Sequence, residues 1–352
     1  MADSIIMRGQ AILENQSDSS SLLQVGAFQT ALLDLIQSPS GRYMEQNWES
    51  YLNRSAGSVV DVVRNATKDT KFPLDRLSVG KGLFYQYSKT GNSVYRDTLS
   101  ALRISIDLQP RNEFGGLWYY VYPNWSYLDG MFSLFSFYTV YTPHFDIENT
   151  TATASWANPT TGASPIVWGR ALGWFMMGLV DFLEFELDLA PIDFENEVAT
   201  WHGRFVELSN AILQAVDPVS GAWWQVLSAA GREGNYIEAS VSAMFSYTLL
   251  KGVRLGLLND TSTYNIRGKA NTGYSYTSVA ARAYRSLVQR FVVENTDGTL
   301  SYNGTVGVCS LNSTASYEYY VTQPLVYDSV LGSAAFVRAS VEYELQHGNL
   351  YS

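Results

Sequence analysis

The chain is poor in charged residues, and the charge it has is mostly negative. Only 16% of its 352 residues are Asp, Glu, Lys or Arg, whereas soluble proteins usually have roughly 25%. The 33 acidic residues outnumber the 23 basic ones and leave a formal net charge of −10. Proteins that bind nucleic acid or anionic membranes need clustered Lys and Arg, so the composition argues against both kinds of partner.

Cysteine and histidine are also scarce. The single cysteine, Cys309, excludes an intramolecular disulfide framework and a cysteine-based zinc cluster. The histidines His144, His202 and His347 are far apart and match no metal-ligand or catalytic-triad spacing. No run reaches about 18 apolar residues, so the sequence predicts no membrane-spanning helix. We therefore expect neither a metal site nor a membrane anchor.

What the chain does contain is many glycosylation sequons, Asn-x-Ser/Thr without proline. They begin at Asn15, Asn53, Asn65, Asn124, Asn149, Asn259, Asn303 and Asn312. One sequon is a weak signal, because Asn, Ser and Thr are common residues. So many in an acidic, lysine-poor chain favour a secreted eukaryotic protein that carries N-glycans. The first residues, MADSIIMRGQ, lack a basic region followed by an apolar run, so we expect a mature or trimmed form.

Apolar residues recur at intervals of three and four along almost the whole chain, which predicts helices. We expect them at about 2–14, 22–37, 42–64, 75–88, 93–108, 126–141, 166–187, 197–215, 236–256, 274–292 and 325–346. Turn residues separate them, as at 89–92, 217–221 and 295–298, and AWWQVL after the second of these turns predicts a short extended segment. No linker divides the chain, so we predict one all-α domain of antiparallel hairpins over 1–352.

Two aspartates stand where expected helices begin. Asp129 follows an aromatic stretch that includes Trp118 and Tyr127. Aromatic surroundings solvate a carboxylate poorly and raise its pKa, which would make Asp129 a general acid. The alternative is a helix cap, whose pKa would fall instead. Asp75 is the second carboxylate of an acid/base pair or an ordinary N-cap. The residues alone leave these alternatives open.

A further cluster, Trp168, Arg170 and Trp174, opens another expected helix. Arg170 and Trp174 are four residues apart and so share one helical face. A guanidinium beside indoles would stack on a sugar and pair with its carboxylate. It would equally pack on core tryptophans by cation–π contact. Trp224 belongs to a similar cluster after a turn, and such clusters at one mouth of a helical ring are typical of a carbohydrate cleft.

Six ordered segments resemble one family, the unsaturated rhamnogalacturonyl hydrolases of glycoside hydrolase family 105, in particular its secreted fungal members. They are LDRLSVGKGLFYQY, YPNWSYLDGMFSLFSFY, ASPIVWGRALGWFMMGLVDFLE, GAWWQVL, GREGNYIEASVSAMF and YYVTQPLVYDSVLGSAAF. The related unsaturated glucuronyl hydrolases share the fold and the chemistry. The resemblance covers nearly the whole chain and implies an all-α (α/α)6 barrel, a toroid of six helical hairpins.

The resemblance also implies an activity, the removal of a 4,5-unsaturated uronic acid from the non-reducing end of pectin fragments. An acid protonates C4 of the enol ether, water adds at C5, and the resulting hemiketal opens and expels the remaining sugar. This chemistry requires no metal and no organic cofactor. By the matching segments, Asp129 is the catalytic acid/base and Asp75 the second active-site carboxylate. The substrate contacts that we expect are Trp168, Arg170, Trp174, Trp118, Tyr127 and Trp224.

Two departures from the family pattern stand out. The segment HFDIENTTATASWANPTTGASP is too short for the helix and the His-bearing loop that relatives carry there, so the barrel is expected to lack one helix around 142–165. His144 stands too early to replace that histidine. Trp118 occupies a position that is often His in bacterial relatives. Either activity is impaired, or Trp118, Trp156 and their neighbours contact the substrate differently. The alternatives are an unsaturated glucuronyl hydrolase and a catalytically silent carbohydrate-binding homologue.

Overall fold

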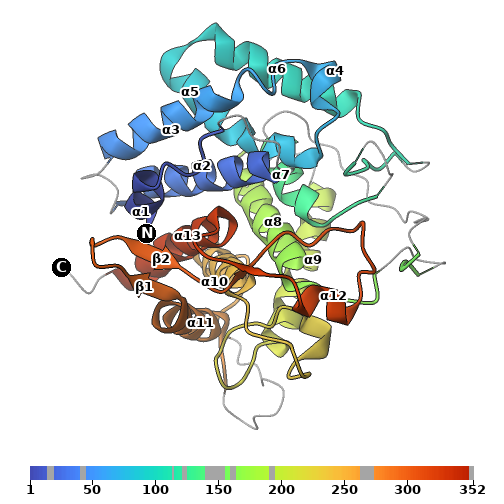
Figure 1. The fold of residues 1–352 in the computed structure, drawn as a ribbon, viewed down its shortest axis with the longest axis vertical. Coiled ribbons are helices and arrows are strands. Elements are labelled where there is room, and N and C mark those ends of the chain that lie inside the picture. Colours follow the sequence, from blue (N-terminus) through green and yellow to red (C-terminus); the bar gives the residue numbers. More distant parts are fainter. Residues whose placement is uncertain are drawn as a thin grey trace. The chain divides into compact units, whose positions relative to one another are not determined.

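A computed structural model of the chain describes residues 1–13, 20–39, 45–112, 115–120, 125–138, 155–158, 164–189, 195–261 and 273–348. Helices dominate these ranges, and the strands form two short antiparallel pairs (Figure 1). The chain divides into two compact units. The N-terminal unit comprises Ile5–Pro165 and Ser310–Ser316, and the C-terminal unit comprises Met1–Ser4, Ile166–Cys309 and Tyr317–Ser352. The single domain expected over 1–352 stays a prediction.

The N-terminal unit follows a short first helix, α1 (Ala2–Met7). Its elements are α2 (Ser21–Gln37), α3 (Glu45–Val59), α4 (Ala66–Asp69), the 3-10 helix η2 (Leu74–Val79), α5 (Gly80–Thr90), α6 (Ser93–Asp107) and α7 (Asp129–Tyr138). Helix η2 packs against both α2 and α7. A Cβ on Gly26 of α2 would lie 2.2 Å from Ser78 Oγ, and one on Gly80 would lie 2.0 Å from the Phe137 ring. Gly26 therefore permits the close packing of η2 on α2, and Gly80 that of α5 on α7.

The turn between α5 and α6 shows how the sequence signals determine the hairpins. Gly91 ends α5 in the left-handed conformation, with φ of 64°, and its N–H donates to Tyr87 O. The next residue, Asn92, caps α6 by accepting a hydrogen bond from the backbone N–H of Val94 at 3.0 Å. The turn predicted at 89–92 is confirmed.

The C-terminal unit is built around α10 (Ala239–Arg254), which packs against α8, α11 and α13. Its other elements are α8 (Gly169–Leu189), α9 (Glu195–Gln214), the 3-10 helix η4 (Leu227–Ala229), α11 (Tyr276–Phe291), α12 (Tyr317–Val321), α13 (Val330–His347), and the strands β1 (Val292–Glu294), β2 (Leu300–Tyr302), β3 (Thr305–Val306) and β4 (Leu325–Val326). Every residue of α10 from 239 to 252 is buried. Hydroxyl side chains inside it bond to the helix itself, as Ser246 Oγ does to Ser242 O.

Charged side chains inside this unit are paired across three helices. Asp181 of α8 accepts from Lys251 Nζ of α10 at 2.7 Å and from Arg338 Nη2 of α13 at 2.9 Å. Tyr247 donates a hydrogen bond to the same carboxylate. Buried charges are tolerated when they are paired and hydrogen-bonded in this way. The network therefore gives the apolar helices a specific register.

Each predicted helix has a counterpart in the structure, but several ends differ. The first stops at Met7, and the third stops at Val59. Asn65 then caps a separate helix, α4, by accepting a hydrogen bond from the N–H of Lys68. The purely helical pattern missed the strands. The turn at 295–298 joins β1 to β2, and the extended segment predicted after Gly221 forms a bridge between Trp224 and Ile237. Most of the interval 142–165 lies outside the described residues.

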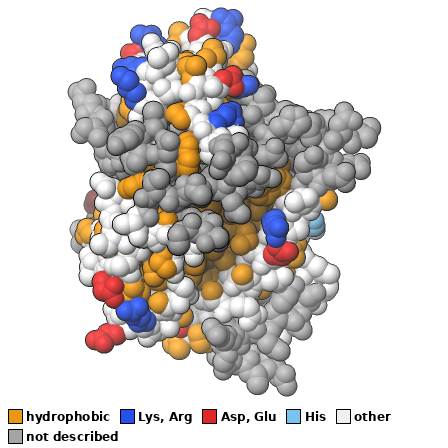
Figure 2. Space-filling view, turned by 90° about the vertical axis from the view of Figure 1, so that its right-hand side faces the viewer, with side chains coloured by type: hydrophobic (Ala, Val, Ile, Leu, Met, Phe, Trp, Pro, Cys, Tyr) orange, Lys and Arg blue, Asp and Glu red, His pale blue; other side chains and the backbone are white. Residues whose placement is uncertain are grey.

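The surface agrees with the sparse charge of the sequence. On the face drawn in Figure 2, the charged side chains of the described residues are few and of both signs, between apolar and uncharged ones. Among the helices that the structure describes, none has the length and apolar character needed to cross a membrane.

Candidate active site

The N-terminal unit brings the two predicted carboxylates together. Asp75 lies in η2, and Asp129 is the first residue of α7, the helix that packs against η2. Both are buried, with 3% of Asp75 and 7% of Asp129 exposed. The charge of Asp129 contributes to the raised pKa of Asp75, so the two groups interact electrostatically. Two carboxylates that share one buried environment are a known arrangement for acid/base chemistry.

Asp75 is set up to hold a proton near neutral pH. Burial raises the pKa of its carboxyl from 3.8 to about 7, and the charge of Asp129 adds to this rise. Its Oδ1 atom is buried and has no hydrogen-bond partner among the described residues. An unpaired carboxylate oxygen is costly to keep ionised inside a protein, so the neutral acid is favoured.

Tyr119 is the group that the sequence analysis did not identify as functional. Its hydroxyl donates to Asp75 Oδ2 at 2.6 Å, and only 6% of the residue is exposed. Burial and the nearby carboxylates raise the pKa of Tyr119 well above its ordinary value, so the phenol stays protonated and remains a donor. This hydrogen bond favours ionised Asp75 and opposes the effect of burial on its pKa. Tyr119 therefore limits the rise in the pKa of Asp75.

A backbone neighbour of each aspartate helps to position Tyr119. Leu74, the residue before Asp75, donates its N–H to Tyr119 O at 3.1 Å. Gly130, the residue after Asp129, lies so close to the Tyr119 ring that a Cβ there would be 2.6 Å from it. Only glycine leaves room for this approach. The glycine after Asp129 is the one local signal in the sequence that something packs against this position.

Arg76 supports the same region from the other side. It is fully buried and donates to Ser105 Oγ at 3.0 Å and to Gln109 Oε1 at 2.9 Å. Gln109 in turn donates to Trp118 O at 2.7 Å. This chain of hydrogen bonds connects η2 and α6 to the segment that carries Tyr119. Arg76 thus fixes the backbone next to Asp75.

Aromatic side chains surround the carboxylates. The rings of Tyr119, Tyr120 and Tyr127 lie with centroids 4.6 to 5.9 Å apart. The predicted contacts Trp118 and Tyr127 are both partly exposed. The hydroxyl of Tyr127 accepts a hydrogen bond from the backbone N–H of Leu311, and Trp156 Nε1 donates to Leu311 O at 3.2 Å. The 310–316 segment is thereby attached to the aromatic cluster.

The other predicted contacts lie in the C-terminal unit, where Arg170 is tied to the backbone. Arg170 is 2% exposed, donates to Gly307 O at 2.6 Å and to Val306 O, and lies 4.9 Å from the centroid of the Trp168 ring. This arrangement matches the alternative left open by the sequence, an arginine packed on tryptophan at a helix start. Its pairing with a substrate carboxylate stays a prediction.

The neighbouring tryptophans differ in exposure. Trp168 donates from Nε1 to Gln225 Oε1 at 3.1 Å and packs beside Tyr320, with centroids 5.7 Å apart. Trp174 is 1% exposed and belongs to the core of its unit, whereas Trp224 is partly exposed. Roles for Trp168, Trp174 and Trp224 in substrate binding stay predictions. Within the described ranges, no group of three or more His, Cys, Asp or Glu side chains is placed to hold a metal ion.

Replacing Arg170 with alanine is expected to lower the free energy of unfolding by roughly 3 kcal/mol, because two buried carbonyl oxygens lose a charged donor. Urea unfolding measures this loss. If Arg170 only packs at the helix start, KM for an unsaturated uronate substrate and for its methyl ester should change together. A rise in KM confined to the charged substrate, with unchanged unfolding, would instead show that Arg170 binds the carboxylate.

Comparisons with known proteins identify the family. The model of Glycosyl Hydrolase Family 88 matches residues 147–346. A 24.9 kDa protein in the picA locus of Rhizobium radiobacter is 33% identical over 193 residues, which cover 53% of this chain and 76% of that protein. A family 105 glycoside hydrolase structure from C. acetobutylicum ATCC 824 is 28% identical with a TM-score of 0.77, and the match covers 98% of each chain.

A possible family 105 member from Klebsiella pneumoniae subsp. pneumoniae MGH 78578 has a similar fold, with a TM-score of 0.68 at 18% identity over 92% of this chain and 82% of that one. The all-α (α/α)6 fold implied by the resemblance is confirmed. The family model matches more than half of the chain. The chain therefore belongs to Glycosyl Hydrolase Family 88, with the family 105 glycoside hydrolases that its sequence resembles.

Proposed function

We propose that the protein removes a 4,5-unsaturated uronic acid from the non-reducing end of rhamnogalacturonan fragments, with Asp129 and Asp75 as the catalytic carboxylates. The observation that carries the proposal is the buried pair, in which Asp75 has its pKa raised to about 7 beside Asp129. Such a pair holds one proton near neutral pH and retains one carboxylate. Hydration of an enol ether needs both forms, an acid for the carbon and a base for the water.

The steps follow from this shared proton. In the reactive form the single proton of the pair is on Asp129, the acid/base, and Asp75 is ionised. Asp129 delivers this proton to C4 of the unsaturated ring, and positive charge develops at C5 and the ring oxygen. Water adds at C5 and returns its proton to the carboxylate, so the pair ends as it began. The C5 hemiketal then opens, and the group on C1 leaves. Asp75 adjusts the proton affinity of Asp129 through their mutual repulsion, and Tyr119 holds Asp75 in place.

The proposal is tested by substrate choice. The absorbance of the conjugated enol ether carboxylate disappears when C4=C5 is hydrated, so its loss measures turnover directly. We expect turnover of an unsaturated rhamnogalacturonan disaccharide at a much higher kcat/KM than of an unsaturated glucuronyl disaccharide. The reverse preference would assign the protein to glucuronyl substrates. Binding of both without loss of absorbance would identify the catalytically silent homologue.

Replacing Tyr119 with phenylalanine is expected to move the alkaline limb of the kcat profile to higher pH. The Tyr119 hydrogen bond lowers the pKa of Asp75, so its removal raises that pKa and keeps the pair singly protonated to a higher pH. The measurement is kcat against pH for both proteins. A Tyr120→Phe variant is the control, because the hydrogen bond that Asp75 accepts from a tyrosine comes from Tyr119 and not from this neighbour. An unshifted limb would show that Tyr119 has only a packing role.

We further propose that the protein is secreted and glycosylated. The sequon asparagines in the described part of the chain are all exposed: Asn53, Asn65, Asn259, Asn303 and Asn312. Where their side chains are bonded, the oxygen is the bonded atom. Asn65 Oδ1 accepts from Lys68 N, and Asn259 Oδ1 accepts from Thr261. The amide nitrogens that would carry a sugar are thus left free.

Expression through a eukaryotic secretory pathway should therefore yield glycoprotein. Enzymatic removal of N-glycans converts each occupied Asn to Asp, which peptide mass spectrometry detects. We expect conversion at several of the five exposed sequons. Secretion without any conversion would show that these sequons are not used.

A further inference from the structure

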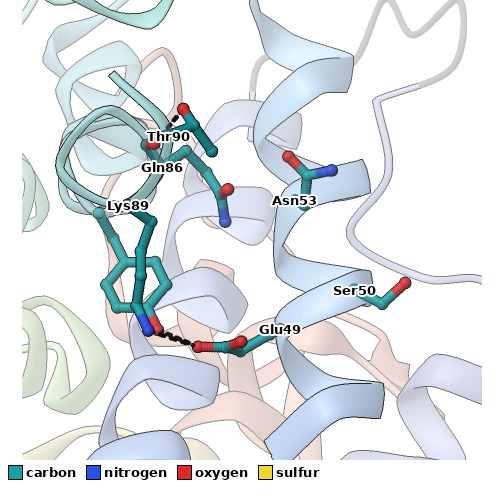
Figure 3. A pocket seen from close by; sticks show the side chains of 7 residues that line it. Glu49, Ser50, Asn53, Gln86, Lys89 and Thr90 are labelled. Carbon is teal, nitrogen blue, oxygen red and sulfur yellow. Dashed lines mark hydrogen bonds and ion pairs between the residues drawn. The ribbon is translucent and has the colours of Figure 1, made fainter. Parts of the chain in front are cut away.

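A polar pocket lies between α3 and α5 of the N-terminal unit, apart from the catalytic pair (Figure 3). Its volume is about 300 Å³, at the lower end of the range of small-molecule sites. Every lining side chain can donate or accept hydrogen bonds: Glu49, Ser50, Asn53, Tyr85, Gln86, Lys89 and Thr90. Asp75, Asp129 and Tyr119 are not among them, so the inference does not rest on the proposed function.

Gln86 is the side chain that points to a ligand. Only 5% of the residue is exposed, and its amide makes no hydrogen bond to the described residues. Figure 3 shows this amide directed across the pocket towards α3, which carries Asn53. The amide is not among the fully buried polar atoms that lack a partner, so its donors and acceptor open into the pocket that Gln86 lines. Polar groups that are largely buried are nearly always hydrogen-bonded, to the protein or to a molecule beside them. A partner that both donates and accepts, as a hydroxyl does, would satisfy the amide.

The charges in the pocket cancel. Lys89 Nζ lies 3.1 Å from Glu49 Oε1, and the hydroxyl of Tyr85 donates to the same oxygen. These contacts hold the pKa of Glu49 below its ordinary value, so the carboxylate stays ionised opposite the ammonium. No net charge is left to attract an anion. A neutral ligand is favoured over a uronate.

At the opposite end, Asn53 keeps its own donors available. Its Oδ1 accepts a hydrogen bond from the Tyr95 hydroxyl at 3.0 Å, which fixes the orientation of the amide. The NH₂ group is then free to donate. Ser50, on the same helix, is exposed at the rim. Amides on two facing helices, in a pocket that Ser50, Tyr85 and Thr90 also line with hydroxyl groups, form a surface suited to a ring that carries several hydroxyl groups.

We propose that this pocket is a saccharide-binding site for a neutral pyranose, with the Gln86 amide as its central contact. The sugar has two sources with the same chemistry. One is a unit of a free oligosaccharide. The other is the first sugar of a glycan on Asn53, which opens a sequon at the edge of the pocket.

The test uses the full chain made in bacteria, without glycans, and labelled isotopically at glutamine. Galactose, rhamnose, N-acetylglucosamine and galacturonate are titrated separately while the Gln86 amide signals are followed by NMR. We expect at least one neutral sugar to shift these signals at millimolar concentration, and galacturonate to shift them less. Gln86→Leu should abolish binding and leave kcat unchanged, and Ser88→Ala, on the same helix outside the pocket, should retain binding.

A second variant tests the same site in case Gln86→Leu does not fold. Ser50→Trp fills the pocket from an exposed position and should also abolish the shift. No shift with any neutral sugar, or shifts that persist in Ser50→Trp, would overturn the proposal. Glycosylated protein separates the sources. If the Asn53 glycan occupies the pocket, free sugar no longer binds until Asn53→Gln removes the glycan; if an oligosaccharide does, free sugar binds both forms equally.

Discussion

Replacing Asp129 with asparagine is expected to lower kcat by about 10³-fold, within the usual range for loss of a general acid/base. Asparagine has nearly the same shape, so the start of α7 and its packing on η2 should persist. It cannot supply a proton to C4 or accept one from water. The measurement is the rate of absorbance loss from the unsaturated disaccharide at saturating concentration, with KM determined in parallel.

The control for this loss is Asp61→Asn. Asp61 is an aspartate whose side chain is 81% exposed and forms an ion pair with Arg64 at the surface. It should keep full activity, because an exposed ion pair contributes little to the structure. Loss of a general acid/base usually lowers the rate by about 10²-fold or more. If Asp129→Asn retained more than about a tenth of the wild-type rate, the catalytic assignment would therefore fail.

Replacing Asp75 with asparagine is expected to reduce activity and at the same time to stabilise the fold at neutral and alkaline pH. The pKa of Asp75 rises from 3.8 to about 7 on folding, chiefly because of burial. A carboxyl that holds its proton more tightly when folded contributes stability that is full below pH 4 and is lost as pH rises through 7. Asparagine carries no charge, so the variant does not lose this contribution.

The size and direction of the effect can be measured by urea unfolding at two pH values. At about 1.4 kcal/mol per pH unit, the rise in pKa corresponds to roughly 4 kcal/mol. Asp75→Asn should therefore exceed the wild type by several kcal/mol at pH 8 and differ little from it at pH 4. Asparagine can still accept the Tyr119 hydrogen bond, so the packing is preserved. Equal stabilities at pH 8 would contradict the buried, proton-holding state of Asp75.

A more stable Asp75→Asn variant would show that Asp75 lowers the free energy of unfolding of the wild-type protein at neutral pH. The wild-type chain keeps a carboxyl where an amide would be more stable, because only a carboxyl exchanges protons at working pH. Active sites are where folds accept this kind of local destabilisation. Tyr119 reduces this loss of stability, since its hydrogen bond stabilises the ionised form of Asp75.

Local sequence signals predicted the elements well because they act over a few residues. Periodic apolar residues located the helices, and Gly91 with Asn92 located a hairpin turn. The short strands were missed, because two or three residues show no periodicity and β1 forms only by pairing with β2. The third helix was predicted to continue to residue 64, whereas it ends at Val59 and the side chain of Asn65 caps a separate helix.

The sequence by itself determined the fold class, the family resemblance and the two aspartates, since each depends on residue identity and short spacing. Only the tertiary structure decided which groups meet them. The Tyr119 hydroxyl reaches Asp75 across 44 residues of chain, and the guanidinium of Arg170 is tied to Gly307 across 137. The pKa of Asp75 is likewise set by burial and by Asp129. Distances and solvation of this kind arise only when distant segments pack, and no local pattern encodes them.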